Sequence, residues 1–151
     1  MVDVSKKPET LRVARAHAFV RASGEALRLI RSSANPKGDP LEIARIAGIM
    51  GAKGTSDLIP LCHPLLLTHV NVRASIRPKG IELRSEVTTT SSTGVEMEAL
   101  TAVTIAALTI YDMCKSADRY MEITEVYLEE KSGGQRGHFL RAAKSSRRKQ
   151  R

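Results

Sequence analysis

A chain of 151 residues, 42% hydrophobic and only 3% aromatic, has the length of one domain and predicts a core of Ala, Val, Ile and Leu. We expect no signal peptide, because residues 1–7 have no apolar region, and no membrane span, because Glu96 and Glu98 interrupt the longest apolar run. Residues 138–151 hold six basic residues and no acids, which leaves +2 of the net charge of +8 for the remainder, so nucleic acid is an improbable main partner.

The first third of the chain predicts one strand followed by two helices. Residues 11–23 alternate apolar and basic side chains in a mixed pattern that favours a strand, with a helix as the alternative. A short amphipathic helix is predicted over residues 25–31, and a second over residues 41–52, where Asp39 and Pro40 have the order of an N-cap and a first helical residue. One face of that second helix carries Ile43, Ile46, Ala47 and Met50.

The middle of the chain predicts an irregular segment and a hairpin. Pro60 and Pro64 rule out a regular helix through residues 58–67. Residues 68–77 and 81–90 then predict two strands joined by a short turn at residues 78–80.

The longest predicted helix spans residues 95–117 and precedes a last strand at residues 122–130. Residues 99–110 are apolar nearly all round the helix, which indicates burial on more than one side, with a sheet on one side and another subunit on the other. The order of elements predicts an α+β fold: a ferredoxin-like antiparallel sheet with helices packed on one face.

Asp112 and Lys115 are the first candidates for catalysis, because they lie three residues apart on one helical face. A helix C-terminus disfavours negative charge, so we expect a raised pKa for Asp112, suited to an acid. The alternative is an ordinary surface pair.

Glu96 and Glu98 fall in the first turn of the same helix, either complementing its dipole or facing a site. His63 follows Cys62 in an apolar loop, where a structural role is the alternative to a functional one. The spacing does not suit zinc, and no metal site is expected. The separation of Cys62 from Cys114 indicates a reducing, cytoplasmic compartment.

Lysines adjoin glycines at residues 37–39, 53–55 and 131–134. A lysine beside exposed glycine N–H groups can bind an anion, although each occurrence alone is commonplace and none has the Walker A order.

Taken together, six segments resemble the MoaC family, which is that of cyclic pyranopterin monophosphate synthase. The resemblance covers residues 1–137, the expected catalytic domain, and leaves residues 138–151 as a basic, disordered tail. The segments are MVDVS at 1–5, KGD at 37–39, ARIAGI at 44–49, LIPLCHP at 58–64, TGVEMEAL at 93–100 and LTIYDMCK at 108–115.

The resemblance implies a lyase of molybdenum cofactor (molybdopterin) biosynthesis. It would convert 3′,8-cyclo-7,8-dihydroguanosine 5′-triphosphate, a GTP derivative, to cyclic pyranopterin monophosphate and release pyrophosphate. It also implies a homohexamer of three dimers with active sites at subunit interfaces, and no required cofactor, although Mg²⁺ could accompany the triphosphate. Catalytic positions fall on Lys37, Asp112 and Lys115, and substrate-binding positions on Leu61, Cys62, His63, Glu96, Met97, Glu98 and Lys131.

Two departures from the family pattern concern the anion site. Gln135 and Arg136 stand where the family usually has Lys-Ser, so the positive charge falls one residue later, and Gly54 replaces a residue that is often basic. Two other classes of protein remain as alternatives: a non-catalytic nucleotide-binding oligomer and a nucleic-acid-binding module that uses the tail.

Overall fold

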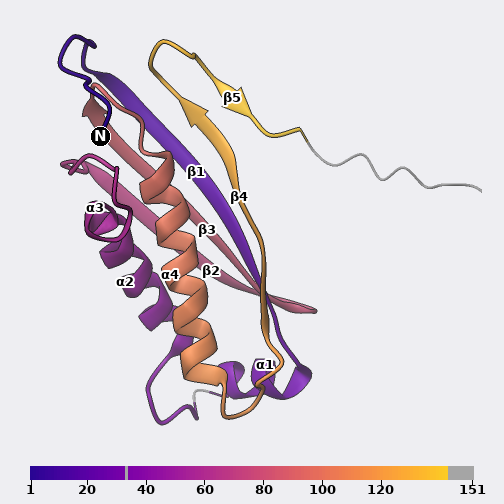
Figure 1. Ribbon diagram of the computed structural model, residues 1–151. Helices are drawn as coiled ribbons and strands as arrows, with labels where there is room; N and C mark the ends of the chain where they lie inside the picture. Colours follow the sequence, from indigo (N-terminus) through magenta and orange to yellow (C-terminus); the bar gives the residue numbers. More distant parts are fainter. Residues whose placement is uncertain (33, 143–151) are drawn as a thin grey trace, which may run out of the picture.

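The computed structural model describes residues 1–32 and 34–142. The predicted strand at the start of the chain is confirmed over its alternative, a helix, and every predicted helix and strand is present (Figure 1). The elements are β1 (Thr10–Arg21), α1 (Gly24–Arg31), α2 (Pro40–Lys53), α3 (Thr55–Leu58), β2 (His69–Arg77), β3 (Gly80–Ser91), α4 (Glu96–Cys114), β4 (Glu122–Ser132) and β5 (Phe139–Leu140).

The five strands form one antiparallel sheet in the order β2-β3-β1-β4-β5, with β1 at its centre. Helices α2 and α4 lie against one face of this sheet, and α1 lies at the end where β1 leaves it (Figure 1). Alternate residues of β1 are fully buried beneath the helices, as a period of two requires: Ala14, Ala16, Ala18 and Val20. The predicted α+β class is confirmed.

Helix α2 begins as the sequence predicts, because the Asp39 side chain accepts hydrogen bonds from the first turn and Pro40 is its first residue. Ile43, Ile46 and Met50, on the apolar face that the sequence pattern marked, nevertheless face outward, and Met50 is 67% exposed. The buried face consists instead of small residues, including Gly48 and Gly51, which let α2 approach α4 closely.

A second side of α4, where the apolar pattern suggested another subunit, is covered by α2 of the same chain. Ile105 of α4 packs over Gly51, while Leu108 remains 51% exposed. Contrary to the sequence expectation, α4 is long and apolar enough for a membrane span by length and composition. Because 56% of that stretch is buried inside the domain, it is accounted for as a core helix.

The expected tail begins later than residue 138. Strand β5 pairs with β4, and the Arg141 guanidinium lies 4.7 Å from the centre of the Tyr127 ring, a cation–π contact. Residues 138–142 therefore extend the domain. Residues 143–151 lie outside the described residues, and their disorder stays a prediction.

Replacing Gly48 by Ala tests the close contact of the two helices. A Cβ at this position would lie 2.8 Å from the Ala102 carbonyl oxygen and 3.2 Å from Val72 methyl groups. We expect Gly48→Ala to lower the free energy of unfolding by about 1–3 kcal/mol in denaturant titrations, despite the better helix propensity of alanine.

Gly54→Ala is the matched control, since the nearest atom to its Cβ would be 3.5 Å away and its φ of −99° suits alanine. Equal stability losses in the two variants would contradict this account of the helix contact.

Candidate active site

Ten predicted site residues form two groups at opposite ends of α4. The first, which we call the lysine–aspartate cluster, consists of Lys37, Asp112 and Lys115. The ammonium Nζ of Lys37 lies 2.7 Å from Asp112 Oδ2, and that of Lys115 lies 2.7 Å from Asp112 Oδ1. The structure therefore brings all three predicted catalytic residues together within one chain.

A buried residue that the sequence analysis missed holds the lysine-bearing loop in place. The Asn35 side chain donates a 2.7 Å hydrogen bond to the Met113 carbonyl oxygen and accepts one of 2.9 Å from the Lys37 backbone N–H. This amide fixes the start of the loop against the C-terminal turn of α4 and so sets the position of Lys37 beside Asp112.

The expectation of a raised pKa for Asp112 is wrong. Hydrogen bonds from Lys115 and then Lys37 lower the pKa of Asp112 to about 2, and the Asp112 carboxylate raises the pKa of Lys115. Two adjacent ammonium groups outweigh the weaker effect of the helix C-terminus. At neutral pH the cluster holds one carboxylate, which can accept a proton, between two ammonium groups, which can donate one.

Both partners of Asp112 are half-exposed, so the cluster is open to a ligand. A shallow cavity of about 460 Å³ adjoins it, lined by Lys115 together with Tyr111, Ser116 and Arg119. The positive charge around this opening exceeds the single negative charge of Asp112, which suits an anionic substrate.

The second group surrounds a cavity of about 470 Å³ at the N-terminal end of α4, the His63 cavity. Six of the seven predicted substrate-binding residues line it. They come from the 59–68 loop and from the start of α4. They are Leu61, Cys62, His63, Glu96, Met97 and Glu98. The N-terminal residues Val2, Val4 and Lys7 complete its wall.

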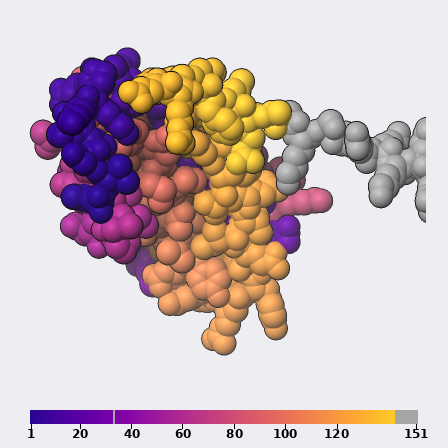
Figure 2. Space-filling view, turned by 45° about the horizontal axis from the view of Figure 1, so that its top comes forward, coloured from indigo at the N-terminus to yellow at the C-terminus, as the bar shows by residue number. Residues whose placement is uncertain are grey.

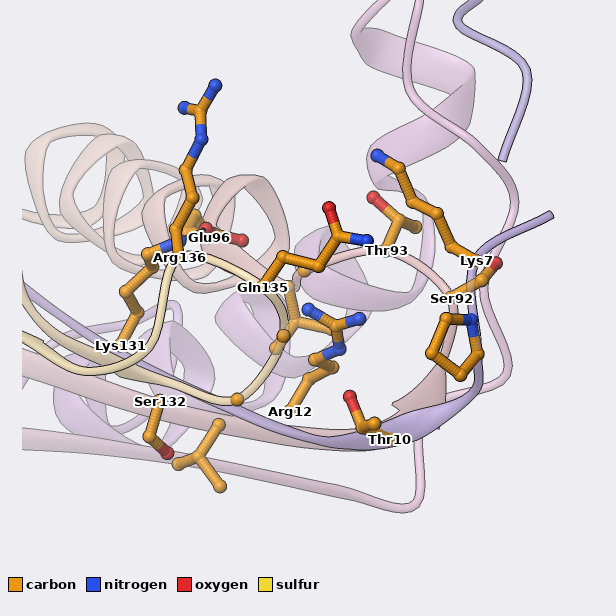
Figure 3. A pocket seen from close by; sticks show the side chains of 16 residues that line it. Lys7, Thr10, Arg12, Ser92, Thr93, Glu96, Lys131, Ser132, Gln135 and Arg136 are labelled. Carbon is orange, nitrogen blue, oxygen red and sulfur yellow. Dashed lines mark ion pairs between the residues drawn. The ribbon is translucent and has the colours of Figure 1, made fainter. Parts of the chain in front are cut away.

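The seventh residue, Lys131, lines an adjoining cavity of about 540 Å³, the cationic cavity (Figure 3). Its ammonium lies 3.1 Å from Glu96 Oε1, and Lys7, Arg12 and Arg136 supply three further positive charges. The floor includes Gly133 and Gly134 at φ of 91° and 78°, conformations that favour glycine. A side chain at either glycine would clash with Leu11 or Arg12.

Burial distinguishes Glu98 of the His63 cavity from Asp112 of the lysine–aspartate cluster. Glu98 is only 4% exposed, and this burial, with the nearby charge of Glu96, raises the pKa of the Glu98 carboxyl. Burial likewise raises the pKa of the Cys62 thiol, which stays protonated at neutral pH. Glu98 is therefore the carboxyl whose pKa is raised, the direction that the sequence analysis expected for Asp112.

The two groups are too far apart to act together within one chain. Glu96 and Asp112 are 16 residues apart along α4, which corresponds to about 24 Å at 1.5 Å per residue. The cavity beside Lys115 shares no lining residue with the His63 cavity or the cationic cavity.

Sequence reasoning missed Lys7 and Arg12, which line the cationic cavity beside Arg136, a residue already named as a departure at the anion site. Arg12 was read as one of the basic residues of a strand, although its Nε donates to the Ser91 carbonyl oxygen at the cavity. Of the two departures, Gln135 and Arg136 line this cavity, whereas Gly54 ends helix α2 and lines neither this cavity nor the His63 cavity. Within the described residues no group of three or more His, Cys, Asp or Glu side chains could hold a metal ion.

This α+β domain has an exposed lysine–aspartate cluster at one end of α4 and, at the other end, the His63 cavity beside the cationic cavity. These are features of an enzyme that acts on a phosphorylated small molecule. A family model agrees: it matches residues 1–134 and is described as MoaC family. The chain belongs to the MoaC family.

Similar proteins extend this match over almost the whole chain. Cyclic pyranopterin monophosphate synthase 1 of Mycobacterium tuberculosis (strain ATCC 25618 / H37Rv) is 56% identical over 144 residues, which cover 95% of this chain and 85% of the relative. The proteins named cyclic pyranopterin monophosphate synthase in Syntrophomonas wolfei and Desulfitobacterium hafniense are 56% and 55% identical. These alignments cover 93% of this chain and 91% and 87% of the relatives.

Because the pKa of Glu98 is raised in the folded protein, the stability of the fold should depend on pH. The folded state holds the proton of Glu98 more tightly than the unfolded chain, so its stabilising contribution is complete below the unfolded pKa, about 4.3. It is lost as pH rises through the folded pKa. We expect the thermal midpoint of Glu98→Gln, measured from pH 4 to pH 8, to rise relative to the parent protein as pH increases.

Asp112→Asn serves as a control of opposite sign, because the folded pKa of Asp112 is lowered to about 2. Its contribution is present above the unfolded pKa, about 3.9, and is lost as pH falls toward 2, so this control is measured from pH 2 to pH 6. A difference between Glu98→Gln and the parent protein that does not change with pH would contradict the prediction.

Proposed function

We propose that this chain is a cyclic pyranopterin monophosphate synthase, a phosphorus–oxygen lyase of molybdenum cofactor biosynthesis. Its substrate is 3′,8-cyclo-7,8-dihydroguanosine 5′-triphosphate, and its products are cyclic pyranopterin monophosphate and pyrophosphate. The observation that carries the proposal is the ionised Asp112 held between Lys37 and Lys115 in a chain 56% identical to a protein of that name.

The reaction needs proton transfers as the purine-derived ring opens and a pyranopterin forms. Asp112 is charged and can accept a proton, whereas Lys37 and Lys115 can donate one to a leaving nitrogen. Positioned acids and bases of this kind each contribute about 10²–10⁴-fold to a rate.

Formation of the cyclic phosphate is a substitution at phosphorus. A substrate hydroxyl oxygen forms a bond to the α-phosphorus, and the bond from that phosphorus to the bridging oxygen breaks. Pyrophosphate leaves with the electron pair, and the hydroxyl proton goes to a base. Arg12, Lys131 and Arg136 of the cationic cavity would stabilise the charge that develops on the leaving group. We propose no redox cofactor and no required metal, although Mg²⁺ can accompany the triphosphate.

We further propose that a complete active site forms between two subunits. A two-fold axis near Thr104, midway between Glu96 and Asp112, would lay two α4 helices antiparallel and bring the lysine–aspartate cluster of one subunit to the His63 cavity of the other. Along one side of α4 the exposed residues Met97 and Leu108 offer an apolar surface for that contact.

The outward face of α2 supports a larger assembly. Ile43, Ile46 and Met50 are 42%, 47% and 67% exposed, and they offer a second apolar surface that dimers could bury in a hexamer of three dimers. A cytoplasmic location suits the free Cys62 and Cys114.

Incubation with the cyclised GTP triphosphate and detection of product test the function directly. We expect Asp112→Asn and Lys115→Ala to reduce kcat by at least about 10²-fold while the variants stay folded. Lys53→Ala is the control, since this exposed lysine at the end of α2 lines none of the three cavities. Binding of the substrate without turnover by the parent protein would instead indicate a non-catalytic binding protein.

Mixing inactive variants tests whether two subunits share the site. We expect a 1:1 mixture of Lys115→Ala and His63→Ala subunits, after exchange, to regain about one quarter of the parent activity, because half the dimers are mixed and each contains one intact site.

The control mixture combines Lys115→Ala with Lys37→Ala. Both lysines contact the same Asp112, so every site in a mixed dimer carries one substitution and activity should stay absent. Recovery in both mixtures, or in neither despite proven exchange, would contradict the shared site.

A further inference from the structure

The N-terminal segment, residues 1–9, lies along the boundary between the two cavities. Val2 and Val4 line the His63 cavity, Pro8 lines the cationic cavity, and Lys7 lines both. In Figure 2 this indigo segment borders the magenta 59–68 loop and the yellow loop of residues 133–137. The segment thus forms a wall that both cavities share.

A local turn sets the position of Lys7 in this wall. Asp3 Oδ1 accepts a 2.9 Å hydrogen bond from the Ser5 N–H, and the Lys7 N–H donates one of 3.0 Å to the Val4 carbonyl oxygen. In Figure 3 the Lys7 side chain lies on one side of the cationic cavity and those of Lys131 and Arg136 on the other, with Arg12 between them.

The cations of this cavity are not equally available to a ligand. Lys131 is paired with Glu96 at 3.1 Å, and Arg12 Nε is bound to the Ser91 carbonyl oxygen. Lys7 and Arg136 form no ion pair within residues 1–32 and 34–142. The hydroxyl of Thr10, at the same cavity, is buried without a hydrogen-bond partner in that part of the chain. The cavity therefore has unused capacity to bind an anion.

The two cavities also differ in what they can bind. The His63 cavity combines apolar Leu61 and Met97 with the Glu98 carboxyl, a mixture suited to a ring system with polar edges. The cationic cavity offers positive charge and glycine backbone, which suits phosphate oxygens. A substrate with both parts would cross the boundary beside Lys7.

We infer that Lys7 is a substrate-binding residue: its ammonium holds the phosphates of the substrate where they pass from the His63 cavity into the cationic cavity. This inference rests on the proposed function for the identity of the substrate. Lys7 binds ground state and transition state alike, since it does not belong to the lysine–aspartate cluster, so its loss should appear in KM.

The experiment compares Lys7→Gln with Lys6→Gln, which removes the same charge from the neighbouring residue that lines neither cavity. We expect Lys7→Gln to raise KM about tenfold with kcat within about twofold, and Lys6→Gln to change neither. Lys7→Arg should restore most of the affinity.

Inorganic pyrophosphate gives a second readout that does not depend on turnover. Its calorimetric Kd should rise about tenfold in Lys7→Gln and stay unchanged in Lys6→Gln. Equal values for these two variants, or a loss confined to kcat, would overturn the role of Lys7. Absence of turnover by the parent protein would overturn the proposed function instead, while the pyrophosphate comparison still decides the role of Lys7.

Discussion

Helices α2 and α4 approach each other closely because α2 presents glycine and alanine where it faces α4, and the rest of the site depends on this contact. The two helices run in opposite directions, so each end of the pair carries parts of one group. Lys37 precedes the start of α2 and meets Asp112 near the end of α4. The end of α2 leads through α3 to Cys62 and His63, beside the start of α4. Small residues in the core thus position both groups.

The same geometry separates two kinds of electrostatic environment. At one end, an exposed carboxylate is ionised by two lysines. At the other, the buried Glu98 resists ionisation, and the cations lie in the adjoining cavity. A reaction that both moves protons and expels a polyanion needs both environments at one substrate. Since α4 holds them about 24 Å apart, an antiparallel partner helix is the simplest way to join them.

Hydrophobic periodicity and the residues that start or stop helices and strands predicted these elements well. Asp39-Pro40, Pro60 with Pro64, and the turn at residues 78–80 act on the local backbone and need no tertiary contact. The assembly of the elements was harder to predict. The face of α2 with Ile43 and Met50 has the pattern of a buried face, yet the side that packs is the one with glycines. The expected pKa of Asp112 considered only its own helix, whereas Lys37 comes from 75 residues away in sequence. Asn35, Lys7 and Arg12 carry no pattern of their own, and only tertiary structure shows where they lie.

The lowered pKa of Asp112 bears on its proposed role as a base. Without substrate, its two ammonium partners make Asp112 a weak base. Phosphate oxygens would compete for the same ammonium groups, because both lysines are half-exposed. Each lysine drawn toward a phosphate removes one cause of the low pKa, which then moves up toward its ordinary value. Binding of the polyanion near the cluster would thereby raise the pKa of Asp112 and make it a stronger base.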